Sequence, residues 1–239
     1  MRKFVIVGSG NRVRNNFLPA IAAMEGEAKT IALASRNKRN AQQAGEPWCV
    51  PSANSVSELP WEDADAVVVS IPPGALISTL ADIRRIKPAI DVVVDTPALP
   101  ATSAWRYRIF DGFSHVAVAE DYMNFPPFEL MRRVCAQLGR PTRIRLEGAG
   151  YSYHGIALIR SFYDFAAIEH LAINEHAGER KISFRMRGGG AGEMTYPYDR
   201  STGRVVVEVA GKELIFDFSG KNVSTRKNQI FVRHGSHRT

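Results

Sequence analysis

The sequence lacks the features of secreted, membrane-spanning and metal-rich proteins. Only two of its 239 residues are cysteines, Cys49 and Cys135, and two isolated cysteines provide neither a disulfide framework nor a metal cluster. No apolar run is long enough for a transmembrane helix, and the apolar run that follows Met1 is too short for a signal peptide. We therefore predict a reducing, cytoplasmic setting, no membrane contact and no metal site.

Positive charge is in modest excess. The chain has 31 Lys and Arg residues against 24 Asp and Glu residues, a formal net charge of +7. A basic balance can indicate nucleic-acid binding, but the basic residues are scattered among acids everywhere except in the tail 221–239. No nucleic-acid module and no stacked aromatics accompany them. Attraction of a small anionic molecule explains the sign more simply, and we expect no nucleic acid partner.

The first half alternates short apolar runs with helical patterns. Runs such as Ala66–Ile71 and Asp91–Val94 are uninterrupted, which is typical of strands buried on both faces of a parallel sheet. Strands alternating with helices predict a doubly wound α/β fold. The expected strands are 3–7, 30–34, 65–71, 91–94 and 115–119, with helices over 38–45, through 77–83 and around 101–111, and mostly loop over 46–60.

The pattern changes after Glu120. A helix is expected over 128–138, and alternating strands follow at 143–147, 182–186, 204–209 and 213–218, the last two joined by a hairpin turn. Gly188–Gly192 is interpreted as a flexible turn, because no helix follows it. The second half is thus predicted to be a smaller α+β domain with a mostly antiparallel open sheet. We place the two domains at residues 1–121 and 122–239.

The start of the chain is its most informative segment. The apolar run Lys3–Val7 enters a turn containing Gly8 and Gly10 and leaves as a helical pattern. This order is what a dinucleotide-binding unit needs, since Gly8 allows the sharp turn and Gly10 lets the backbone approach a pyrophosphate. Val13 stands where the usual fingerprint has its third glycine. The alternative is a strand–helix corner without a ligand.

These residues resemble the Gfo/Idh/MocA oxidoreductase family. The similarity rests on the order and spacing of four pieces, which are Val7–Ile21, Ser70–Pro73, Val94–Pro97 and the strand leading to Ala119–Glu120. The resemblance implies an N-terminal Rossmann domain, which binds a nicotinamide cofactor. It also implies a second domain whose open sheet helps to form the substrate site and often an oligomer interface. We therefore expect a small-molecule substrate and a homo-oligomer formed through that sheet.

The residues after the second strand favour NADP(H) over NAD(H). An aspartate there would repel a 2′-phosphate, whereas Ser35 and Arg36, with Lys38 nearby, can donate hydrogen bonds and positive charge to it. A solvated loop is the alternative interpretation. Arg12 could reach a phosphate or could simply be exposed. The predicted cofactor site comprises Gly8, Ser9, Gly10, Asn11, Arg12, Ser35, Arg36, Lys38, Ser70, Ile71, Pro72, Asp95 and Thr96.

The sequence departs from the family pattern at two places. The family usually has Glu-Lys-Pro after the fifth strand, with the lysine in proton transfer, whereas this chain has Asp95-Thr96-Pro97. Thr96 cannot act as an acid or base near neutral pH. The family also commonly has a histidine and an aspartate three residues apart on a helix. The nearest match here is His154, with Ala157 at the second position.

His154 is the best candidate for proton transfer, because an imidazole suits acid–base work near neutral pH. A histidine packed at the domain junction is the alternative. Tyr122 is the second catalytic candidate, although a packing role is common for a tyrosine. Asp121, Tyr153 and Arg160 are the predicted substrate-binding residues. For Arg160 we favour an ion pair with an acid one helical turn further on, Asp164.

Two functions remain open at this point. The first is an NADPH-dependent oxidoreductase that transfers a hydride to a C=N, C=O or conjugated C=C group of a small molecule. The second is a non-catalytic NAD(P)-binding regulator or accessory protein of the same fold. The missing lysine supports the two equally, since it fits either changed chemistry or lost catalysis.

Overall fold

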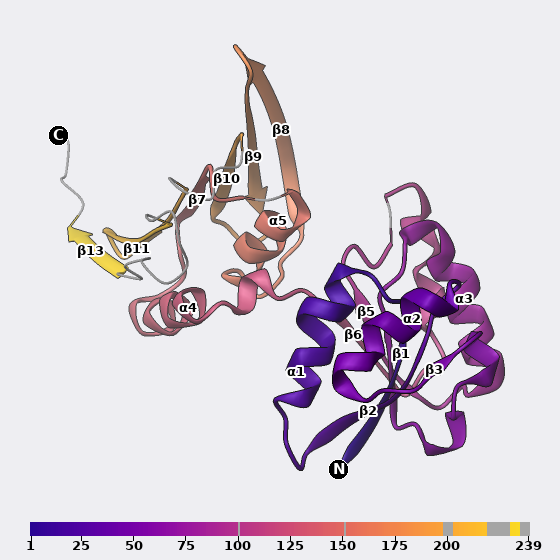
Figure 1. Ribbon diagram of the computed structural model, residues 1–239. Coiled ribbons are helices and arrows are strands. Elements are labelled where there is room, and N and C mark those ends of the chain that lie inside the picture. Colours follow the sequence, from indigo (N-terminus) through magenta and orange to yellow (C-terminus); the bar gives the residue numbers. More distant parts are fainter. Residues whose placement is uncertain (100, 151, 198–202, 219–229, 235–239) are drawn as a thin grey trace. The chain divides into compact units, whose positions relative to one another are not determined.

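The computed structural model describes residues 1–99, 101–150, 152–197, 203–218 and 230–234. The chain divides into two compact units, Met1–Ala119 and Glu120–Thr239, each with its own sheet and core (Figure 1). The predicted boundary lies two residues further along the chain, and the separate roles predicted for the domains stay predictions. None of the helices in the described ranges combines the length and apolar character that a bilayer crossing requires.

The first unit is a six-stranded parallel sheet in the order β3-β2-β1-β4-β5-β6. Its strands are β1 (Arg2–Val7), β2 (Ala28–Ala34), β3 (Ser52–Ala53), β4 (Ala66–Val69), β5 (Asp91–Asp95) and β6 (His115–Ala119). The helices are the π-helical turn η1 (Val13–Phe17), α1 (Leu18–Ala22), α2 (Lys38–Gly45), α3 (Pro73–Ile86) and the 3₁₀ segment η5 (Ala101–Phe110), with shorter 3₁₀ turns η2 (Glu46–Trp48), η3 (Val56–Glu58) and η4 (Trp61–Asp63).

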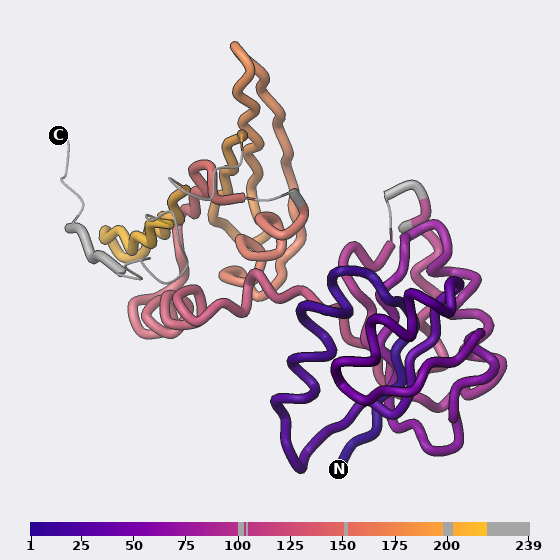
Figure 2. The backbone as a smooth tube through the Cα atoms, viewed as in Figure 1, coloured from indigo at the N-terminus to yellow at the C-terminus, as the bar shows by residue number. Residues whose placement is uncertain are grey.

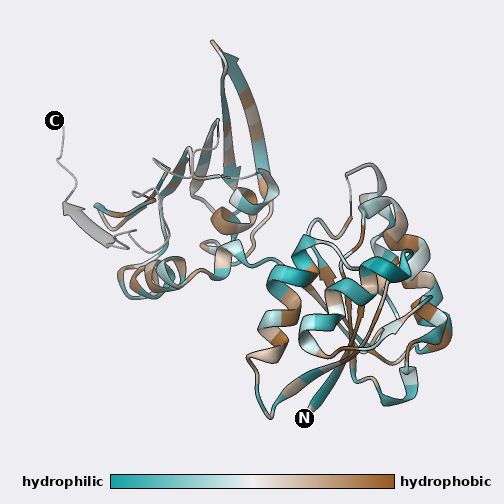
Figure 3. Ribbon diagram, in the orientation of Figure 1, coloured by the Kyte–Doolittle hydropathy of each residue, from teal (hydrophilic) through white to brown (hydrophobic). Residues whose placement is uncertain are grey.

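Helices cover both faces of this sheet, and its central strands are therefore largely apolar. All four residues of β4 are buried, and the central strands are brown in the hydropathy colouring of Figure 3. One core joins one face of the sheet to α3 through Leu76, Leu80 and Ile83. The other joins the opposite face to α1 and α2 through side chains such as Leu18. The doubly wound fold predicted for this half is confirmed.

The second unit contains a seven-stranded sheet in the order β13-β12-β11-β7-β10-β9-β8. Every neighbouring pair is antiparallel except β10 and β7, which are parallel, so the predicted fold class is confirmed here too. Its elements are η6 (Tyr122–Asn124), α4 (Pro126–Leu138), β7 (Arg143–Glu147), α5 (Ser152–Ser161), β8 (Ile168–His176), β9 (Glu179–Met186), β10 (Ala191–Tyr196), β11 (Arg204–Val209), β12 (Lys212–Asp217) and β13 (Ile230–His234).

The core of the second unit lies between the sheet and helices α4 and α5. Phe128 and Met131 of α4 and Leu158 of α5 are fully buried in it. Two ionisable groups share this core. Burial raises the pKa of the Cys135 thiol to about 11 and that of the Tyr163 hydroxyl to about 12. Both groups are therefore neutral near pH 7.

Three local expectations need correction. Strand β8 was not expected, because its apolar residues are exposed; it forms a long hairpin with β9 whose turn holds Ala177 and Gly178 at positive φ (Figure 2). The helix expected around 101–111 is a 3₁₀ segment that is kinked at Arg106. The glycine turn is shorter than expected, since Ala191 and Gly192 already belong to β10.

Candidate functional site

The two glycines of the first turn have different functions. Gly8 has φ +128, and a Cβ there would overlap the carbonyl oxygen of Ser70, so the fold itself requires glycine at this position. At Gly10, apart from its chain neighbours, no protein atom lies within 4 Å of the place that a Cβ would occupy. The fold therefore does not require glycine at position 10, and the space beside it is open to a ligand.

A cleft of about 840 Å³ opens beside this turn. It lies where the strands of the first sheet end in their carboxyl direction, which is the usual ligand position in open α/β sheets. Eleven of the thirteen predicted cofactor residues line it, and Lys38 and Thr96 are the two that are not on its described wall. The eleven are Gly8, Ser9, Gly10, Asn11, Arg12, Ser35, Arg36, Ser70, Ile71, Pro72 and Asp95.

Sequence reasoning missed one side of this cleft. Asn54–Ser57, which follow the short strand β3, line it together with Thr79, Asp82 and Arg85 of α3. The polar run after β3 is the one signal that could have identified part of this wall, because it too follows the carboxyl end of a strand. The residues of α3 carry no such signal.

The end of β2 presents hydroxyl and guanidinium groups to the cleft. The hydroxyl of Ser9 donates to the Ser35 hydroxyl over 2.9 Å, which links the glycine turn to β2. Arg36 follows on the exposed rim of the cleft. Neither Ser35 nor Arg36 is an acid, so among the described lining residues at the end of β2 there is no carboxylate that would repel a phosphate.

The carboxylate of Asp95 connects three strand ends. Its Oδ1 accepts from Arg12 Nε at 3.2 Å and from the Thr96 amide at 2.9 Å, and its Oδ2 accepts from the Ser70 hydroxyl at 2.7 Å. Arg12 also donates to the carbonyl of Ala119. Arg12 is therefore a half-buried ion-pair partner. Of the two alternatives for Arg12, the simply exposed side chain is wrong, and contact with a phosphate stays a prediction.

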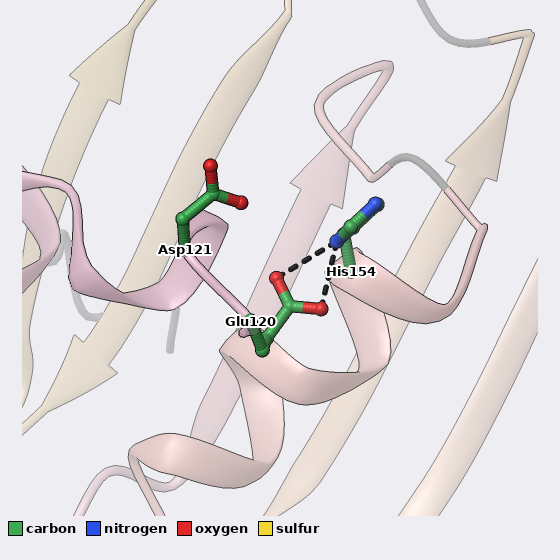
Figure 4. Close-up of side chains that lie close together, drawn as sticks. All are labelled: Glu120, Asp121 and His154. Carbon is green, nitrogen blue, oxygen red and sulfur yellow. Dashed lines mark hydrogen bonds and ion pairs between the residues drawn. The ribbon is translucent and has the colours of Figure 1, made fainter. Parts of the chain in front are cut away.

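In the second unit, His154 is bonded to a buried carboxylate (Figure 4). Its Nδ1 lies 2.7 Å from both carboxylate oxygens of Glu120. The two side chains are 16% and 8% exposed. Asp121 lies beside them, and one ligand atom from each of the three residues falls within 4.8 Å of the others, a set that could also hold a metal ion. Sequence reasoning named His154 and Asp121 but missed Glu120 as their partner.

The other candidates of this unit have structural contacts. The hydroxyl of Tyr122 donates to the Ala149 carbonyl, and its ring packs against Phe128, as the packing alternative would have it. Tyr153 is 37% exposed, with its ring centroid 4.2 Å from that of His154.

Arg160 differs from the expectation. It donates to the carbonyls of Phe165 and Ala166, at 2.6 and 3.3 Å, in the turn that follows α5. Among the described contacts there is no ion pair with Asp164, because the chain leaves the helix there: Asp164 and Phe165 both adopt positive φ. The guanidinium of Arg160 thus stabilises the turn that follows α5.

The fold and the cleft together define a protein with a dinucleotide-binding unit. Residues 2–104 match the family described as "Oxidoreductase family, NAD-binding Rossmann fold", which is the Gfo/Idh/MocA family. The matched residues make up most of the first unit, and this match confirms the family resemblance drawn from the sequence. At the level of the family, the prediction of an NAD(P)-dependent oxidoreductase is confirmed as well.

Solved structures share the fold across both units. One is UDP-N-acetylglucosamine 3-dehydrogenase GnnA from Acidithiobacillus ferrooxidans, at 13% identity and a TM-score of 0.74 over 97% of this chain and 80% of that one. Another is the WlbA dehydrogenase from Chromobacterium violaceum in complex with NADH and UDP-GlcNAcA, at 16% identity and 0.69 over 91% and 74%.

A third is a myo-inositol dehydrogenase from Corynebacterium glutamicum, at 15% identity and a TM-score of 0.74 over 91% of this chain and 75% of that one. At such low sequence identities, the similarity shows a shared fold and nothing more. The search of curated proteins gives no match.

Proposed function

We propose that this protein is an NADPH-dependent oxidoreductase that reduces a C=N, C=O or conjugated C=C group of a small molecule. The observation that carries the proposal is the cleft of the first unit, where the glycine turn and the ends of β2, β4 and β5 converge. The open space at Gly10 fits a group whose phosphates approach the backbone. When bound, such a cofactor supplies the hydride.

The preference for NADP(H) is supported by the rim of the cleft. Ser35 and Arg36 offer hydroxyl and guanidinium donors where an acid would bind the ribose of NAD. Ser55 and Ser57, on the neighbouring loop, add further hydroxyl groups to the same wall. The structurally similar WlbA dehydrogenase is in complex with NADH, so the fold alone does not select NADP(H), and the choice depends on these side chains.

The proton that accompanies hydride transfer is assigned to His154. Thr96 replaces the lysine of the family and has no ionisable group, while the carboxylate next to it, Asp95, is bonded to Arg12 and Ser70. The hydroxyl proton of Tyr122 is directed at a backbone carbonyl. We therefore rank Tyr122 second to His154 as the candidate proton donor.

A non-catalytic cofactor-binding protein is the second candidate. Two features favour it: Thr96 has no ionisable group, and the Asp95 carboxylate already accepts hydrogen bonds from Arg12, Ser70 and the Thr96 amide. The usual position of the base is thus left without a group that exchanges protons. A reductase and a regulator would share the cleft and differ only in turnover.

The two candidates are separated by binding followed by turnover. The purified protein is titrated with NADPH and with NADH by fluorescence, and a panel of carbonyl, imine and conjugated alkene compounds is then screened for loss of reduced-cofactor absorbance. Tighter binding of NADPH and turnover of one class support the reductase. Binding without turnover over a broad panel supports the regulator, and binding of neither cofactor overturns both.

We further propose that a second copy of the chain covers the open sheet of the second unit. The face that turns away from α4 and α5 carries alternating charges, with Arg145 bonded to Glu208 and Glu213 and Lys181 bonded to Glu193. A self-complementary pattern of both signs suits a two-fold interface. Light scattering coupled to size exclusion should give a multiple of the 26.4 kDa chain mass, and a monomer would contradict it. The cytoplasmic setting stays a prediction.

A further inference from the structure

Glu120 is the one charged residue that is buried within the described part of the chain. Burial of a carboxylate is unfavourable unless hydrogen bonds replace its water. Here Oε1 accepts from the backbone N–H of Tyr122 at 3.1 Å, and both oxygens face Nδ1 of His154 at 2.7 Å. The hydrogen bonds described for this carboxylate thus come from one backbone N–H and one imidazole.

The surroundings hold this pair in place. The Glu120 carbonyl accepts from the side chain of Asn124, and the neighbouring Tyr122 is anchored to Ala149. On the other side, Gly155 follows His154, and a Cβ there would come within 2.9 Å of Gly150 Cα. The first turn of α5, which carries His154, is therefore packed tightly.

We propose that Glu120 is the positioning residue of His154: its carboxylate accepts the Nδ1 proton and so makes Nε2 the ring atom that exchanges a proton with the substrate. An imidazole has two tautomers, and the partner of one nitrogen decides which nitrogen remains for chemistry. In Figure 4 the second ring nitrogen points away from Glu120. A carboxylate in this place fixes the ring as the acidic member of a catalytic triad does.

The proposal rests on the proposed function for the identity of the reaction. In the reducing direction the Nε2–H bond of the imidazolium breaks, and an O–H, N–H or C–H bond forms on the substrate atom that receives the proton. The ring becomes neutral and retains its Nδ1 proton against Glu120. The proton on Nε2 is restored from water before the next turnover.

The sharpest variant is Glu120→Gln, which keeps the size of the side chain. The N–H of Tyr122 donates to Oε1, so the amide oxygen of a glutamine would remain there and its NH₂ would face Nδ1. The amide would then donate to Nδ1, and the ring would carry its proton on Nε2. The variant thus inverts the tautomer with little change in packing.

The tautomer is read directly by ¹H–¹⁵N correlation on full-length, ¹⁵N-histidine-labelled protein under conditions where the ring is neutral. The resonances are assigned by their loss in His154→Asn. We expect Nδ1–H in the parent and Nε2–H in Glu120→Gln. The control Glu175→Gln, which removes an exposed carboxylate from the β8–β9 hairpin, should leave the parent pattern. An Nε2–H tautomer in the parent overturns the proposal, whether or not Glu120→Gln folds.

Two further readouts separate this role from the alternatives. With a substrate from the panel, Glu120→Gln should lower kcat by about 10²–10⁴-fold and leave KM and NADPH affinity within about two-fold; an unchanged kcat overturns the proposal. Selective broadening of His154 by micromolar Mn²⁺ would show a cation site formed with Asp121, which also overturns it. Failure of NADPH to bind would remove the proposed function and leave the tautomer result standing.

Discussion

The two units of the molecule build their candidate sites by different means. In the first unit the cleft is made by backbone turns at the ends of parallel strands, and most of its wall comes from short segments that follow β1, β2, β3 and β4. In the second unit the site depends on two side chains that are 34 residues apart in sequence. A site made by backbone tolerates many side-chain changes, whereas a site made by one buried pair fails when either member changes.

The largest expected effect lies in the glycine turn. Gly10→Val should abolish dinucleotide binding and leave the melting temperature unchanged, because its side chain would enter only the open cleft. Gly8→Ala should instead destabilise the fold by about 1–3 kcal/mol or more, since alanine strains at φ +128. Fluorescence titration and thermal unfolding measure the two effects.

Gly74→Val is the matched control for this pair of variants. Gly74 also has open space around it and lies outside the described wall of the cleft. The Gly74→Val variant should bind NADPH with the affinity of the parent protein. Parent-like binding by Gly10→Val would show that the turn does not hold the phosphates.

The next effect tests the second unit. His154→Ala should reduce turnover by about 10²–10⁴-fold, the usual contribution of general acid catalysis. NADPH affinity should stay as in the parent, because the cleft lies in the other unit. Steady-state kinetics on a panel substrate and fluorescence titration give the two numbers. Near-parent turnover would make His154 structural, and Tyr122→Phe would then be the next variant.

A smaller effect is expected for the choice of cofactor. Arg36→Ala should weaken NADPH by roughly 1–3 kcal/mol, the range for hydrogen bonds to charged groups, and should leave NADH nearly unchanged. Arg39→Ala removes an equal charge from an exposed position of α2 outside the described wall. It should alter neither affinity by a comparable amount. Equal losses of both cofactors in Arg36→Ala would mean that this residue does not contact the 2′-phosphate.

The smallest effect compares the single cysteine of each unit. Cys49 is exposed and Cys135 is buried. A pKa raised to about 11 by burial leaves only about one thiolate in a thousand at pH 8 for Cys135, and the thiolate is the reactive form. A thiol reagent should therefore modify one cysteine per native chain and the second only after unfolding. Rapid modification of both in the native protein would contradict the burial of Cys135.

Much of the first unit follows from local sequence, because each of its signals is short-range. Gly8 and Gly10 are adjacent to a strand, and Ser70 and Asp95 end buried apolar runs, so their convergence follows from the parallel sheet alone. Arg85 does not follow, since nothing in the pattern of α3 tells which exposed side chain borders a cleft.

The second unit is harder to predict, because its features depend on tertiary pairing. Leu171 and Ile173 of β8 are each 55% exposed, so the strand lacks the buried alternation that identifies strands in sequence. The bond between Glu120 and His154 joins the end of one segment to the start of a distant helix. Neither residue carries a local sign of the other, and only the fold brings them together.

The ion pair of Arg12 has a consequence for the ionic-strength dependence of ligand capture. Two of the arginines that line the cleft have carboxylate partners, Arg12 with Asp95 and Arg85 with Asp82. The fields of these two arginines are largely cancelled at a distance, which leaves Arg36, with Lys38 nearby in the sequence, to attract an incoming anion. Added salt screens such steering and slows association. Salt should therefore slow the capture of NADPH more than that of NADH, because the extra phosphate of NADPH is attracted by the basic side chains that follow β2.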